Sequence, residues 1–189
     1  MTVRLLSSAV FAILLGGVAN AVQQVKSLYT PIDFAKCEPM LRDGGTAGRV
    51  CEGLPEYPVF VAADSDKTFL SAGPHAAETR AAAQSLNAEN SIFDGHTRPT
   101  VEWRFVIRDD RPVPYATIVR YFTRSSEGHG EVLVVSRVAR GEACHVAYID
   151  ALANGEPIVL ARKVADTQAR QFDCASEPTV VGARGRSPM

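Results

Sequence analysis

The sequence lacks the short motifs by which the commonest enzyme classes are recognised. Its 189 residues contain no Gly-x-Ser-x-Gly, no His-Glu-x-x-His and no Gly-x-x-x-x-Gly-Lys pattern, so serine hydrolases, zinc peptidases and P-loop nucleotide hydrolases are not indicated. It has no Cys-x-x-Cys pair, and no histidine stands at ligand spacing from a cysteine. We therefore expect neither a metal nor another cofactor.

Net charge is also almost absent. The chain has 20 basic and 21 acidic residues, which gives a formal net charge of −1. Nucleic-acid binding without sequence preference and adsorption to anionic lipid both need a clustered basic excess. We therefore expect no nucleic-acid partner and no electrostatic attachment to a membrane surface.

Long apolar runs are scarce. The one at residues 5–18 is shorter than the ~20 residues that span a bilayer. It follows Arg4 and precedes Ala19-Asn20-Ala21, a small-residue pattern typical of signal-peptide cleavage. We predict a cleaved signal peptide at residues 1–21, so that the protein is periplasmic or secreted and does not insert into a membrane afterwards. An uncleaved membrane anchor is the alternative.

The rest of the chain has the length of one domain. Residues 22–175 fall within the usual domain size of ~100–200 residues, and we predict a single globular domain there. Residues 176–189 are rich in Ser, Pro, Gly and Arg, so we predict that they form a disordered tail.

The chain contains only four cysteines, which allow three disulfide pairings. We favour Cys37–Cys51, because these two flank the strong turn signal Asp43-Gly44-Gly45, and Cys144–Cys174, because this bridge would join a strand to a helix. Each disulfide would stabilise the fold by about 3 kcal/mol through restriction of the unfolded chain. If both form, no thiolate remains as a nucleophile.

Four segments with strand patterns follow one another in the second half of the chain. Apolar and polar residues alternate over 101–108, and the next three segments are rich in β-branched and aromatic residues. Short turns separate them, which is typical of an antiparallel β-meander. The four segments are 101–108, 115–123, 131–138 and 144–151, and shorter extended pieces occur at 28–34, 58–63 and 68–72.

One long helix is predicted near the C-terminus. Residues 158–172 place their apolar side chains on one helical face, and Asn154 is a candidate cap. We predict an α+β fold in which this helix packs on the meander. The alternative is a β-sandwich in which residues 28–72 supply a second sheet and the helix lies at the rim. The alanine-rich segment 75–86 is interpreted as a surface helix or a mobile insertion.

A charged face of the predicted sheet is the candidate binding site. If Trp103 points into the core, its neighbours Glu102 and Arg104 point the other way. Three arginines there could bind a carboxylate or a phosphate, although a sheet face opposite the core is normally charged and solvated. The proposed binding residues on this face are Glu102, Arg104, Arg120, Arg137 and His145.

The segments from Pro99 onward resemble an uncharacterised group of exported alphaproteobacterial proteins. The matching strings, in the same order, are PTVEWRF, PYATIVRYF, EVLVVSRV, ACHVAYIDA and LARKVADTQARQFDC, and Cys51–Gly73 fits an earlier segment of the group. This resemblance implies export, the same cysteine pattern and a single domain, but no activity.

A fainter resemblance is to the periplasmic inhibitors of invertebrate-type lysozyme. It rests on Arg120-Tyr121-Phe122, Glu131–Arg137 and Tyr148–Ala151. The Ser/Gly-rich inhibitory loop of that family would fall at Val138–Ala143, where this sequence reads VARGEA.

Together these features favour a non-enzymatic binding or interaction module. The expected partner is another periplasmic protein or a small anionic ligand. One alternative is a small periplasmic hydrolase with dispersed catalytic residues, for which Glu102, His145 and Asp64 are candidates. The others are a lysozyme-inhibitor-like protein and a purely structural envelope protein.

Overall fold

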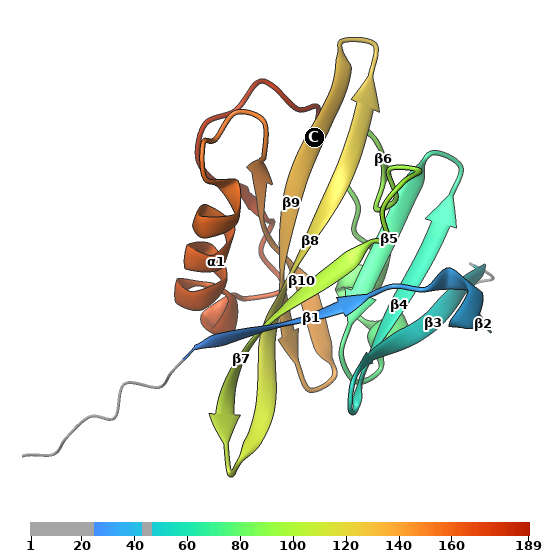
Figure 1. Cartoon of the computed structure of the whole chain (residues 1–189), viewed down its shortest axis with the longest axis vertical. Helices are drawn as coiled ribbons and strands as arrows, with labels where there is room; N and C mark the ends of the chain where they lie inside the picture. The colour runs from blue at the N-terminus through green and yellow to red at the C-terminus, as the bar shows by residue number, and fades with distance from the viewer. Residues whose placement is uncertain (1–24, 43–46) are drawn as a thin grey trace, which may run out of the picture.

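The computed structural model describes residues 25–42 and 47–189 and has three layers (Figure 1). A four-stranded sheet, sheet B, packs on one face of a seven-stranded sheet, sheet A, and one α-helix packs on the other face. The predicted signal peptide at 1–21 and the predicted turn at 43–45 lie outside the described residues.

Sheet A contains the predicted meander. Its four central strands pair in chain order through antiparallel ladders, as the alternation and the short turns predicted. A further strand joins each edge of the sheet, and a short strand, β6 (Glu89–Ser91), pairs with β8 beside this path. In spatial order the path is β1 (Lys26–Pro31), β7 (Thr100–Arg108), β8 (Arg111–Ser125), β9 (Gly128–Ala139), β10 (Glu142–Asp150) and β11 (Thr179–Val180).

Sheet B is an antiparallel meander formed by the first part of the domain. Its strands are β2 (Glu38–Leu41), β3 (Ala47–Leu54), β4 (Tyr57–Asp64) and β5 (Lys67–Ala72). Between the two sheets lies an apolar core that includes the fully buried Trp103. The second sheet of the alternative arrangement therefore exists, whereas the helix lies across the other face of sheet A and not at the rim.

The α-helix, α1 (Pro157–Thr167), is shorter than predicted because a 3₁₀ turn at Ala169–Gln171 takes over its last part. Its apolar face packs on sheet A as predicted, with Ala161, Val164 and Ala165 buried there. The predicted cap was wrong. Glu156 stands at the cap position, while the side-chain amide of Asn154 donates to the carbonyl oxygens of Asp150 and Ala183.

Both predicted disulfides are confirmed. Cys37–Cys51 fastens the segment before β2 to β3, and Cys144–Cys174 fastens β10 to the segment after the helix. The described residues contain no free cysteine.

The alanine-rich segment 75–86 is not a surface helix. It forms two 3₁₀ turns, Ala76–Glu78 and Arg80–Ala83, in which every alanine except Ala83 is buried, in part against Phe60 of sheet B. Small side chains allow this close approach of the backbone to the sheet. The segment has no wide apolar stripe that would predict this packing, because each alanine buries little apolar area.

The last residues are ordered in the structure, although their composition predicted disorder. β11 pairs in parallel with β10, and Ser187 is buried. The buried carboxylate of Asp150 accepts the backbone N–H groups of Arg186 and Ser187 and the Ser187 hydroxyl. Gly130 makes room for this contact, since a Cβ there would lie 2.5 Å from the Cα of Ser187. Composition alone does not reveal such a long-range partner.

Candidate functional site

The predicted charged face is covered. Trp103 points into the core as expected, and Glu102 and Arg104 point to the opposite face of sheet A, but α1 lies over that face and both side chains are buried. The face is covered because sheet A lies between two layers, sheet B on one side and α1 on the other.

Glu102 and Arg104 belong to a network of ion pairs that fastens α1 to the sheet. Arg104 forms a bidentate pair with Asp166 of the helix, with Nε–Oδ1 and Nη2–Oδ2 distances of 2.9 and 2.7 Å. Glu102 accepts from Nε of Arg162 at 2.7 Å, and the Tyr115 hydroxyl donates to Asp166 at 2.6 Å. Burial lowers the pKa of Arg104, but the hydrogen bond to Asp166 and the charges of Asp166, Tyr115 and Glu102 together outweigh it, so the net shift is upward. These groups are occupied with one another and hold the helix in place.

Arg120 lies on the same face, beyond the start of α1. It forms an ion pair with Glu131 and, with Glu102 and Tyr29, lines a cleft of about 240 Å³. Of the five proposed binding residues, only Glu102 and Arg120 line this cleft.

His145 lies on the opposite face of sheet A, so its predicted place was wrong. Arg137 pairs with Cys144 across the β9–β10 ladder, so Cys144 shares the face of Arg137. His145 follows Cys144 along β10, and its side chain therefore points to the other face. The imidazole is buried, and its Nδ1 lies 3.0 Å from the hydroxyl of Tyr148. Its Nε2 has no hydrogen-bond partner among the described residues.

The buried imidazole should make stability depend on pH. Burial, and secondly the charge of Arg80, lower the pKa of His145 to about 3, whereas in the unfolded chain it is ~6.5. The unfolded state therefore binds the proton first, and stability that is complete above pH ~6.5 is lost as the pH falls. We expect this group to cost about 2 kcal/mol between pH 7 and pH 5. His145→Gln should flatten that part of a urea-unfolding pH series, while the exposed control His96→Gln should not; equal slopes would contradict the assignment.

The three hydrolase candidates do not converge. Glu102 is held beneath α1, His145 lies on the other face of sheet A, and Asp64 is exposed at the β4–β5 turn, where it accepts from the Ser65 hydroxyl. General acid–base catalysis needs its groups around one reacting atom, and these three are not arranged in that way.

The fifth residue, Arg137, lines a cleft that we call the arginine notch. The β8–β9 ladder ends at the pair Ala116–Arg137, and beyond it the ends of the β7–β8 and β9–β10 hairpins separate (Figure 1). β8 has prolines at 112 and 114, which carry no N–H for a ladder, and the β7–β8 register shifts beside them. The resulting notch has a volume of about 280 Å³ and is lined by Tyr57, Val106, Arg108, Val113, Pro114, Tyr115, Arg137, Val138, Ala139, Arg140 and Arg170.

Four of the side chains that line the arginine notch are arginines, and two of them are held in place. Arg137 pairs through Nε with Glu142 at 3.0 Å and donates from Nη1 to the carbonyl oxygen of Arg170 at 2.6 Å. The Arg170 guanidinium lies 4.1 Å from the centre of the Tyr115 ring. Arg108 and Arg140 are exposed and make no ion pair with the described residues. No carboxylate of the described chain lines the notch.

Only part of this site was predicted from the sequence. Arg137 was among the proposed binding residues, whereas Arg108 and Arg140 stand next to turns between the predicted strands and Arg170 lies within the predicted helix 158–172. The order of the strands could have predicted this meeting of arginines. In a meander, the turns after residues 108 and 139 lie at the same end of the sheet, in neighbouring hairpins.

The fold and the two disulfides define a class: a small α+β domain of an oxidising compartment, where disulfides persist. No protein-family model, no curated protein and no solved structure matches the chain. In the part that the structure describes, no helix is long and apolar enough to cross a membrane. The same residues contain no group of three or more His, Cys, Asp or Glu side chains that could hold a metal ion.

Proposed function

We propose that this protein is a non-enzymatic binding module that works outside the cytoplasm and recognises an anionic group in the arginine notch. The observation that carries this proposal is four arginines around one cleft with no carboxylate among its described lining. Arg137 is already paired with Glu142, so the positive charge offered to a ligand comes first from Arg108 and Arg140, which are exposed and form no ion pair with the described residues. Guanidinium groups match carboxylates and phosphates through paired hydrogen bonds, so a ligand carrying either group fits.

The four arginines differ in how they would act. Carbonyl oxygens and an aromatic ring hold Arg137 and Arg170, so they are already oriented when a ligand arrives. Arg108 and Arg140 are exposed at the hairpin ends and can close on the ligand. Apolar walls from Val106, Val113 and Val138 border these charges, as in most ligand sites.

The test is a double variant, Arg108→Gln/Arg140→Gln. The probes are pyrophosphate, citrate and trigalacturonate, each titrated calorimetrically at low ionic strength into the mature protein. Each charge-assisted hydrogen bond contributes about 1.5–3 kcal/mol, so we expect the double variant to bind at least ~10-fold more weakly than the wild type. Arg184→Gln/Arg186→Gln removes the same charge from exposed residues outside the notch and is the matched control.

Three results would overturn the proposal. The first is an unchanged affinity of the notch double variant, and the second is that none of the three anions binds the wild type. The third is equal weakening in both double variants, which would show that only overall charge matters. Unfolding curves of all three proteins should coincide, since the changed arginines are exposed and form no ion pair with the described residues, and such side chains contribute little to stability.

A further inference from the structure

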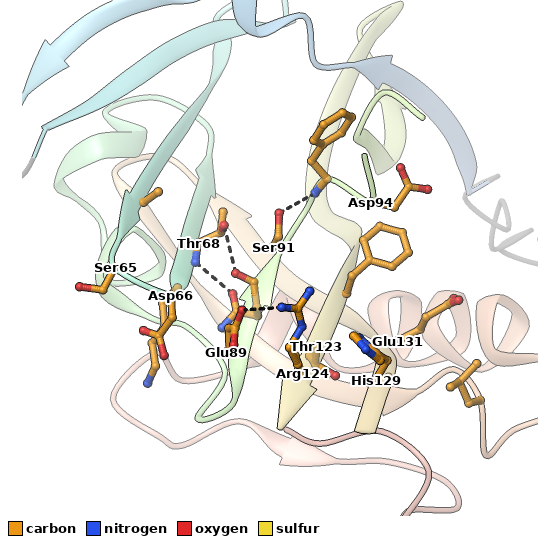
Figure 2. Close-up of a pocket in the computed structure, with 17 residues that line it drawn as sticks. Ser65, Asp66, Thr68, Glu89, Ser91, Asp94, Thr123, Arg124, His129 and Glu131 are labelled. Atoms are coloured by element: carbon orange, nitrogen blue, oxygen red, sulfur yellow. Dashed lines mark hydrogen bonds and ion pairs between the residues drawn. The ribbon is translucent and has the colours of Figure 1, made fainter. Parts of the chain in front are cut away.

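A larger cleft, which we call the polar groove, lies between the two sheets at the other end of the β8 strand (Figure 2). Its volume of about 660 Å³ is within the ~300–1,000 Å³ typical of small-ligand sites. Ser65, Asp66 and Thr68 border it from sheet B, while Arg124 and His129 border it from sheet A. It shares no lining residue with the arginine notch.

The floor of the polar groove is rigid. The Asn90 side chain is buried and accepts the backbone N–H of Thr68, while its amide nitrogen donates to the Ser85 hydroxyl and to the carbonyl oxygen of Ala88. The Thr68 hydroxyl in turn donates to the backbone carbonyl oxygen of Asn90. The groove is therefore formed before a ligand arrives, which reduces the entropy lost on binding.

The polar groove carries charges of both signs. Its lining includes the carboxylates of Asp66, Glu89, Asp94 and Glu131 and the cationic side chains of Lys67 and Arg124. Glu89 lies 3.7 Å from Arg124, and Glu131 pairs with Arg120. Backbone N–H groups of Thr97 and His96 lower the pKa of Asp94 to about 2, so this carboxylate stays ionised and is already an acceptor in its own loop. An anionic ligand would meet four carboxylates, and a cationic ligand would meet Lys67 and Arg124. A neutral ligand that needs many donors and acceptors meets neither repulsion.

Aromatic surface is exposed beside these polar groups. The Phe93 side chain lines the polar groove with 47% of its surface in water, and Phe122 lines it as well. An exposed ring gains contact area when an apolar face covers it.

We infer that the polar groove binds a neutral saccharide. A pyranose ring matches this groove, because its C–H face can lie on a phenyl ring while its hydroxyls form hydrogen bonds with carboxylate and guanidinium groups. Concave shape distinguishes this site from a flat protein-binding surface, and the mixture of both charge signs distinguishes it from the arginine notch. The inference is independent of the function proposed for the notch.

The experiment titrates tri-N-acetylchitotriose and cellotriose, up to 10 mM, into the isotopically labelled mature protein and follows backbone amide shifts. We expect at least one of the two to move the amide signals of residues 65–68, 89–94 and 123–130 together. Phe93→Ala should weaken this binding at least ~10-fold, and Phe93→Trp should restore it, because a larger flat ring still stacks. Leu41→Ala, which removes a side chain that is 75% exposed on β2, is the matched control and should bind as the wild type does.

The inference is overturned if neither trisaccharide shifts these amides, or if Phe93→Ala binds as tightly as the Leu41→Ala control. Failure of Phe93→Trp to restore binding would also contradict stacking. The arginine-notch double variant should bind the trisaccharide normally, and loss of binding there would show that the two clefts are not independent.

Discussion

Val164→Asp should lower the free energy of unfolding by several kcal/mol. Val164 lies near the middle of α1 with 2% of its surface exposed, in the apolar layer between the helix and sheet A. A carboxylate placed there would lose its hydration without gaining a partner in that layer, and such changes are among the most destabilising single substitutions. Urea unfolding followed by circular dichroism measures the loss, and the melting temperature should fall as well.

The same helix supplies the control. Val159 is 54% exposed on α1, so Val159→Asp places the same charge in water and should change the unfolding free energy by no more than about 0.5 kcal/mol. If Val164→Asp melted at the temperature of the Val159→Asp control, the docking of α1 on sheet A would be wrong.

Arg104→Ala should cost about 2–3 kcal/mol, because it leaves the half-buried carboxylate of Asp166 without its charged partner. Asp166 would lose a bidentate partner, and Glu102, which is buried beside it, would keep only Arg162 and Ser27. Equilibrium unfolding again measures the loss. Adding Asp166→Asn to Arg104→Ala should cost less than the sum of the two single changes, since both remove the same interaction.

Arg120→Ala is the matched control for this network. Its ion pair with Glu131 joins two side chains that are 41% and 35% exposed, and pairs of that kind contribute ~0–1 kcal/mol. Equal losses from Arg104→Ala and Arg120→Ala would show that the network beneath α1 does not fasten the helix. The difference between the two variants also distinguishes arginines that stabilise the fold from arginines at the surface that a ligand can reach. The spacing of these residues in the sequence did not distinguish the two kinds.

Local pattern was sufficient for much of the fold. Alternation over 101–108 and the β-branched segments after it predicted the four meander strands, because side-chain direction repeats every two residues along a strand. The apolar face at Ala161, Val164 and Ala165 predicted the docking of the helix. The turn between Cys37 and Cys51 predicted their bridge, since a tight turn brings its flanks together.

The candidate site was predicted only in part, and register explains the difference. The sequence placed Arg137 and His145 on one face, whereas the pairing of Arg137 with Cys144 sends the next residue to the other side. Which residues lie opposite one another on separate strands depends on ladder register and bulges, and neither has a local signature.

By itself, the sequence determined the four meander strands, the amphipathic helix and the near-neutral charge, all of which depend on neighbouring residues or on composition, and it favoured the two disulfide pairs. Only the tertiary structure decided that both faces of sheet A are covered, that Glu102 and Arg104 hold the helix, and that the last residues bind Asp150. It also decided that arginines from separate hairpins meet in one notch. These are long-range contacts, and their free energy depends on which layer covers which face, a property of the assembled chain and not of any segment in it.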